Sequence, residues 1–372
     1  MATNVFTLEA LEAKHGDALL LHYGPLADPR LIVIDGGPAG VYQGSLRPRL
    51  HQIRQNRGGG QLEIRMLMVS HIDDDHIVGV LDFVAELLKD FDNKQKLAFD
   101  VLTLWHNSFD DIIAKMGAAA ADVLAARFSG DTADAAAIVA SVRQGRQLRL
   151  NADALAINMN SGFDDLIRFD KAATPLTIGT GLQFTVLGPR QAELDALKDK
   201  WRKELPALLK KGKTTEAAAA EFLDTSVHNL SSVIVLAAFD GKTMLLTGDA
   251  RGDFIVDSLR EGQLLTNGTI DVDILKMPHH GSRRNISVDF FKTIRARHYV
   301  VSANGRDGNP DPPTFADLFQ ARPQGPYDIW LTNDVAPAVQ TIENGKPAGV
   351  VLHLPDAVGD SVRVELASPI AW

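Results

Sequence analysis

The stretch Ser70-His71-Ile72-Asp73-Asp74-Asp75-His76-Ile77-Val78-Gly79 places two imidazoles and three carboxylates in six consecutive positions. It follows the apolar run EIRMLMVS and precedes a segment, Val78–Phe91, with helical periodicity. So many charges after a buried strand are unfavourable unless something positive binds there. Imidazole with carboxylate suits Zn²⁺, Mn²⁺ or iron, and extra carboxylates favour harder ions. An acidic helix cap would explain one aspartate but not both histidines. The sequence therefore predicts a metal site at a strand end, where open α/β sheets bind ligands.

Two further motifs place ligand-type side chains at strand ends. Asp249 follows an apolar run in LLTGDA, where a carboxylate can bridge two ions. His279 and His280 end another such run in Lys276-Met277-Pro278-His279-His280-Gly281-Ser282. Taken alone, each motif is equally typical of a surface turn, because Gly-Asp pairs and loop histidines are common. Their meaning depends on whether the fold brings them to the first cluster.

The distribution of apolar runs predicts the architecture. Short β-type runs dominate both halves of the chain, helical patterns lie between them, and polar residues collect at the strand ends. This organisation favours an α/β fold of the two-sheet αββα type over a strictly alternating parallel sheet. We expect one domain over residues 1–372, with helical insertions near 108–170 and 190–226.

Composition limits the classes of function. Apolar residues make up 45% and charged residues 23% of the 372, and no apolar run approaches the length of a membrane span. There is no cysteine, so a metal would be held by His, Asp, Glu or backbone oxygen. The net charge of −9 disfavours a dedicated nucleic-acid binder, although bound divalent cations would offset local acid. No signal peptide is recognisable, so we expect a cytoplasmic protein without membrane contact.

Together, SHIDDDHIVG, LLTGDA and MPHHGS resemble the metallo-β-lactamase superfamily, and most closely the metallo-β-lactamase-like domain of the competence protein ComEC. The membrane segments of that protein have no counterpart here. The resemblance covers most of the chain outside the two insertions. Its further elements are His15-Gly16-Asp17-Ala18, Ile34-Asp35-Gly36-Gly37, Asn229-Leu230-Ser231-Ser232, Ser302-Ala303-Asn304 and Gly308-Asn309-Pro310.

The resemblance implies a ligand set for two divalent ions, zinc or manganese. His71 and Asp73 would bind the first ion, and Asp75 and His76 the second. Asp249 would bridge the two ions. The segments SSVIVLAAF and TMLLTGDA, joined by a turn that contains glycine, predict a hairpin. The remaining expected ligands are His279 or His280 for the second ion and, just before that hairpin, His228 or Asn229 for the first.

Other residues would support the ions. Asp35 would orient ligands from behind, and so would Asn229 where His228 is the ligand. The superfamily usually has histidine at the position of Asp73, and a one-metal enzyme is the alternative that this departure leaves. Asn309 also stands where the family has a histidine, which puts a substrate contact there in doubt. Asp75 or Asp249 would hold an activated water in line, and the expected substrate contacts are Ser282, Arg283, Arg284, Asn304 and Asn309.

The chemistry expected from such a centre is hydrolysis. Two divalent ions lower the pKa of water and offset charge that develops on a phosphoryl or carbonyl oxygen. We expect a phosphodiesterase, most simply a DNA or RNA nuclease, with a regulatory protein partner as a further expectation. The alternatives are a hydrolase of small esters, lactones, thioesters or cyclic nucleotides, and a non-catalytic binding module. Fold alone does not decide among them.

Overall fold

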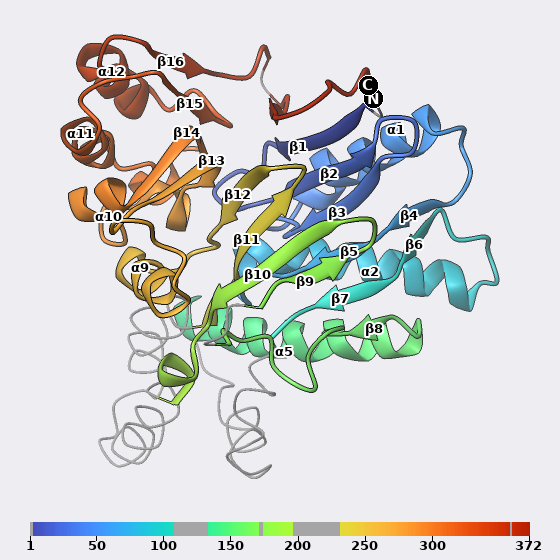
Figure 1. Cartoon of the computed structure of the whole chain (residues 1–372). Coiled ribbons are helices and arrows are strands. Elements are labelled where there is room, and N and C mark those ends of the chain that lie inside the picture. Colours follow the sequence, from blue (N-terminus) through green and yellow to red (C-terminus); the bar gives the residue numbers. More distant parts are fainter. Residues whose placement is uncertain (1–2, 108–132, 171–173, 196–230, 358) are drawn as a thin grey trace.

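The apolar runs of the sequence form strands in a computed structural model that describes residues 3–107, 133–170, 174–195, 231–357 and 359–372, without the side chains of 133–143. The strands build two main sheets that pack face to face, and helices cover both outer faces (Figure 1). This is the αββα sandwich that the sequence predicts, and the fold class is confirmed.

The first sheet runs β17-β1-β2-β3-β5-β7-β8. Its strands are β1 (Asn4–Ala10), β2 (Leu19–Pro25), β3 (Arg30–Ile34), β5 (Met66–Met68), β7 (Thr103–Trp105), β8 (Asn158–Met159) and β17 (Val362–Glu365). The strands β3, β5, β7 and β8 are mutually parallel, so their carboxyl ends meet at one edge. A separate parallel pair is formed by β4 (Leu62–Ile64) and β6 (Phe99–Val101).

The second sheet runs β16-β15-β14-β13-β12-β11-β10-β9. Its strands are β9 (Leu176–Ile178), β10 (Leu182–Gly188), β11 (Ile234–Phe239), β12 (Lys242–Leu246), β13 (Ile270–Lys276), β14 (Ile294–Val301), β15 (Tyr327–Leu331) and β16 (Val350–His353). The predicted hairpin is confirmed as the antiparallel pair β11–β12. From β12 to β16 the strands are parallel, which again gathers their carboxyl ends.

Helices cover the outer face of each sheet (Figure 1). Those of the first sheet are the π-helical turn η1 (Tyr42–Leu46), α1 (Arg47–Asn56), α2 (Asp74–Asp92) and α5 (Ala133–Ala154). Those of the second are α9 (Gly252–Glu261), α10 (Val288–Thr293), α11 (Pro312–Ala321) and α12 (Ala336–Gly345). Two 3₁₀ turns, η2 (Pro278–Gly281) and η3 (Arg306–Gly308), lie in strand-to-helix loops. In the described residues, no helix is long and apolar enough to cross a membrane.

Three apolar clusters hold these layers together. The first lies between the sheets and includes Phe6, Met68, Phe184 and Ile274. The second packs the first sheet against α1, α2 and α5, and the third packs the second sheet against α9 to α12. Because both faces of each sheet are covered, strands such as β3, β5 and β11 are continuous apolar runs rather than alternating ones.

The predicted insertion near 108–170 contributes to the sandwich where it is described. Its helix α5 contacts α2, and its strand β8 pairs with β7 at the end of the first sheet. The other insertion, near 190–226, lies almost wholly outside the described residues. The boundaries of both insertions, and the single domain, stay predictions.

Candidate metal centre

The first predicted motif spans the loop after β5 and the first turns of α2. Asp73 precedes the first helical residue with an extended backbone, but its side chain makes no capping hydrogen bond. Its Oδ2 lies 3.3 Å from His71 Nε2 instead. The aspartate at the cap position is thus directed at an imidazole, and the acidic-cap explanation fails for it. His71 is buried, so this pair is not a contact between two side chains on the surface.

A second ligand set crosses from one sheet to the other. Ligand atoms of Asp75, His76, Asp249 and His280 all lie within 4.8 Å of one another. His280 Nε2 is 3.2 Å from Asp75 Oδ2, and His76 Nε2 is 3.5 Å from Asp249 Oδ1. These are the residues that the sequence predicts for the second ion, and they come from the first turn of α2, the loop after β12 and the turn η2 after β13.

Asp249 lies between the two predicted positions. Its Oδ1 faces His76, while its Oδ2 lies 3.8 Å from His71 Nε2. A further group with metal-ligand spacing is formed by His71, Asp73 and Asp75. This placement suits a carboxylate that bridges two ions. The two candidates expected to complete the first position, His228 and Asn229, lie outside the described residues.

The paired histidines of η2 have different surroundings. Both adopt left-handed backbone conformations, with φ of 46° at His279 and 54° at His280, and their ring planes are 81° apart. His280 is buried within the second ligand set. His279 is one-third exposed, lies 3.7 Å from Asp249 Oδ2, and has its Nδ1 3.1 Å from Asn285 Oδ1. Of the two histidines, the geometry favours His280 as a ligand of the second ion.

Hydrogen bonds determine which ring nitrogens face the centre. His76 Nδ1 lies 2.8 Å from Asp35 Oδ2, and His280 Nδ1 lies 2.9 Å from the Ser302 carbonyl oxygen. Since both partners only accept, each Nδ1 carries a proton, and in a neutral ring each Nε2 presents a lone pair. These two Nε2 atoms are 3.4 Å apart. Two facing lone pairs require a cation or a proton between them, so the site fits a metal.

Asp35 is itself held in place. It adopts a left-handed φ of 59° directly after β3 and accepts hydrogen bonds from Ser70 N at 2.7 Å and Ser70 Oγ at 2.6 Å. With His76 as its third contact, the buried carboxylate has well-defined partners. This is the arrangement expected of a residue that orients a ligand from behind.

Without a metal, protons occupy the second ligand set. Burial opposes a charge on His76, but Asp75 and Asp249 raise its pKa well above the usual value. Burial likewise opposes ionisation of Asp249, but His280, His279 and His76 hold its pKa well below its usual range. A divalent ion would replace the imidazole protons, so its binding is expected to release protons.

A buried ion pair behind His280 was not predicted from the sequence. Lys276 Nζ pairs with Asp17, both side chains are 1% exposed, and Asp17 Oδ1 lies 3.5 Å from His280 Nδ1. Burial opposes ionisation of Asp17, but Lys276 lowers its pKa below the usual range. The signal in the sequence was a lysine at the end of an apolar run, just before the histidine motif.

The predicted substrate contacts lie in two different places. Ser282 is buried, whereas Arg283 is exposed and pairs through Nε with Asp317 Oδ2 at 3.0 Å. Arg283 and Arg284 line a hollow of about 630 Å³ over α10 and α11 that includes none of the metal-ligand groups. Asn304 and Asn309 instead belong to the loop around η3, where they bond to the backbone of Arg306.

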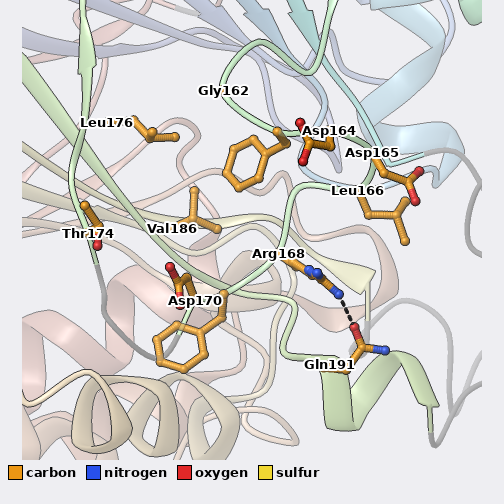
Figure 2. A pocket seen from close by; sticks show the side chains of 12 residues that line it. Gly162, Asp164, Asp165, Leu166, Arg168, Asp170, Thr174, Leu176, Val186 and Gln191 are labelled. Carbon is orange, nitrogen blue, oxygen red and sulfur yellow. Dashed lines mark hydrogen bonds between the residues drawn. The ribbon is translucent and has the colours of Figure 1, made fainter.

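A cavity of about 690 Å³ lies apart from this centre (Figure 2). Its lining includes Phe163, Arg168 and Val186, and Arg168 bonds to Gln191 across it. None of its lining residues belongs to the predicted site. The cavity is therefore separate from the candidate metal centre.

No protein-family model matches the chain, and no curated protein matches it. Among solved structures, it is similar to a protein described as a candidate metal-dependent hydrolase from Parabacteroides distasonis (8% identity, 93% of this chain and 92% of that chain covered, TM-score 0.36). It is also similar to the metallo-β-lactamase fold protein YhfI from Bacillus subtilis (10% identity, 97% of this chain and 99% of that chain covered, TM-score 0.38). A third similar structure is a variant of the CmlA β-hydroxylase (11% identity, 97% of this chain and 54% of that chain covered, TM-score 0.35). The narrower resemblance to the competence protein domain stays a prediction.

Proposed function

We propose that the chain is a metal-dependent hydrolase that cleaves phosphodiesters, with nucleic acid as its substrate class. The observation that carries this proposal is the pair of opposed Nε2 atoms of His76 and His280, 3.4 Å apart. Carboxylate oxygens of Asp75 and Asp249 surround them. Such a cluster of buried imidazoles and carboxylates is unfavourable unless cations bind.

The residues divide into two ligand sets around a shared carboxylate. His71 and Asp73 would hold one ion, Asp75, His76 and His280 the other, and Asp249 both. Bound divalent ions, zinc or manganese, would lower the pKa of a water molecule and offset negative charge on the substrate. Asp75 and Asp249 would accept hydrogen bonds from the attacking water and so direct it, while Asp35 keeps His76 in the required tautomer.

The phosphodiester assignment is supported by the motif resemblance and by Arg306, whose Nη1 lies 3.1 Å from the ring of His15, the residue before the Gly16 contact with Asp75. Arginine suits the recognition of phosphate oxygens because its guanidinium donates two parallel hydrogen bonds. The competing substrate class is a small ester, lactone, thioester or cyclic nucleotide. The same centre would serve either class, so only a comparison of substrates separates them.

The test is hydrolysis by protein loaded with Zn²⁺ or Mn²⁺, with metal content measured by mass spectrometry. Substrates are plasmid, linear single-stranded DNA, RNA and bis-p-nitrophenyl phosphate, beside p-nitrophenyl acetate and a lactone. We expect metal-dependent cleavage of the diesters. His71→Ala and Asp249→Ala should lower it more than about 100-fold, since even residues behind the ligands contribute about 10–100-fold.

The exposed Asp271, which pairs with Arg295 far from the ligand sets, provides a control. Asp271→Ala should keep full metal content and activity. Cleavage of esters or lactones but not of diesters by the loaded wild type would contradict the phosphodiester assignment. A wild type that cannot be loaded with metal would contradict the hydrolase itself and favour a binding module.

A further inference from the structure

The turn between β1 and β2 is fastened directly to the second ligand set. A Cβ atom on Gly16 would lie 1.8 Å from the carbonyl oxygen of Asp75, so only glycine allows this approach. Asp17 N donates to the same oxygen at 3.2 Å, and Ser302 Oγ donates to the Gly16 carbonyl at 2.6 Å. The residue before this contact, His15, is therefore held at the rim of the centre.

Arg306, in the loop after β14, contacts the ring of His15. Its Nη1 lies 3.1 Å from Nε2 and 3.3 Å from Nδ1 of the His15 ring. The loop that carries it follows β14, the strand whose end also supplies Ser302. Two loops that are distant in the sequence thus place an imidazole and a guanidinium together. Burial lowers the pKa of His15, while the negative charge of Asp75 opposes this shift, which agrees with a position of His15 beside that ligand.

The charge of Arg306 is only weakly compensated. Its Nε lies 3.9 Å from Asp307 Oδ2, and the two side chains are 63% and 70% exposed. Exposed pairs at such distances contribute little. Arg283, by contrast, is in hydrogen-bond contact with Asp317 and lies over a different hollow. Arg306 is therefore better placed than Arg283 to offer its charge to a ligand at the centre.

The charge balance of the centre indicates how Arg306 would contribute to substrate binding. Asp17, Asp35, Asp73, Asp75 and Asp249 are its carboxylates, and Lys276 is a buried cation beside them. Two divalent ions would bring this group close to neutrality. An anionic substrate would then gain little net attraction from the centre, so a further cation at its rim would strengthen binding.

We propose that His15 and Arg306 form an anion-binding pair that holds a non-bridging phosphate oxygen of the substrate beside the second ligand set. Nη1 of the guanidinium lies within 3.3 Å of both ring nitrogens, and a ring nitrogen that carries a proton is a further donor. Together the two side chains present donors, as a phosphate oxygen requires. This inference rests on the proposed hydrolase and specifies how its substrate is recognised.

The experiment measures binding of inorganic phosphate to the zinc-loaded protein by calorimetry, and metal content separately. Arg306→Ala should weaken phosphate binding about tenfold, as for the loss of a charged hydrogen bond, with unchanged metal content. Arg306→Lys should recover part of the loss, and His15→Ala should cause a smaller one. Arg297→Ala is the matched control, because Arg297 is 71% exposed and lies 3.7 Å from Asp273.

Kinetics provide a second readout. Arg306→Ala should raise KM for bis-p-nitrophenyl phosphate and leave KM for the uncharged p-nitrophenyl acetate unchanged. Equal phosphate affinity in metal-loaded wild type and Arg306→Ala would overturn the anion-binding pair while leaving the hydrolase intact. The same holds if the loaded wild type binds no phosphate. A wild type that takes up no metal would overturn the hydrolase, and the pair with it.

Discussion

His76 and His280 show how hydrogen bonds behind a ligand determine its chemistry. Asp35 and the Ser302 carbonyl each accept from an Nδ1, which leaves both Nε2 atoms directed at the same point. Neither partner is adjacent in sequence to the histidine that it orients. The choice between His279 and His280, which was open in the sequence, depends on this contact with the end of β14.

A different histidine at the same sheet edge has no such partner. His106 follows β7, is fully buried, and neither ring nitrogen has a hydrogen bond within the part of the chain that the structure describes. Burial, with a smaller effect of Arg149, lowers its pKa to about 4. Between about pH 4 and pH 6.5 the folded protein therefore keeps this ring neutral, whereas an unfolded chain, in which the pKa of histidine is about 6.5, protonates it.

The pH dependence of stability follows from this difference. As the pH falls, the unfolded state binds a proton at His106 before the folded state does. The contribution of neutral His106 to the free energy of unfolding is therefore complete above pH 6.5 and is lost as the pH falls towards 4. The loss amounts to roughly 3 kcal/mol over that range. In metal-free protein, His106→Leu should flatten the fall in the free energy of unfolding, measured by urea denaturation at each pH. Equal pH slopes for the variant and wild type would contradict this assignment.

At the scale of elements, the position of α2 depends on its contact with the loop after β3. Gly36 N donates to the His76 carbonyl at 2.8 Å, and Gly79 N donates to the Gly37 carbonyl at 3.0 Å. A Cβ on Gly79 would lie 1.9 Å from the Gly36 carbonyl oxygen. The helix that carries Asp75 and His76 can therefore approach the Asp35 loop only because both backbones lack side chains there.

Gly79→Ala should consequently destabilise the protein and disturb its ligands. We expect the free energy of unfolding to fall by about 1–3 kcal/mol, as for overpacking, and zinc affinity to fall as His76 moves. Urea denaturation and zinc titration measure the two effects. Gly44→Ala is the control, because a Cβ on Gly44 meets nothing within 4 Å. If Gly79→Ala matched that control in both measurements, the contact would not determine the position of α2.

At the scale of the whole molecule, the candidate centre joins the two sheets. Asp35, His71 and His76 follow strands of the first sheet, while Asp249 and His280 follow strands of the second. A metal bound here would link the two halves of the sandwich. Without it, protonated imidazoles must offset the charge of the buried carboxylates from both halves.

Metal removal should therefore lower global stability. A ligand that binds only the folded state stabilises it by about 4 kcal/mol at 1,000 times its Kd. We expect zinc to raise the Tm of chelator-treated wild type by several degrees in a calorimetric scan. Asp249→Ala should lose most of this rise, and the exposed Asp271→Ala should keep it. An unchanged Tm on zinc addition would argue against a metal that bridges the sheets.

The sequence by itself determined the kinds of ligand and their positions at strand ends. Apolar runs and polar ends predicted the αββα sandwich, the hairpin β11–β12 and the helix that becomes α2, because hydrophobic periodicity is a local property of the chain. Only the tertiary structure decided which strand ends meet. It placed His280 in the second ligand set, Arg283 over a separate hollow, and Arg306 against His15. Such pairings depend on sheet order and loop path, which contacts between distant residues determine.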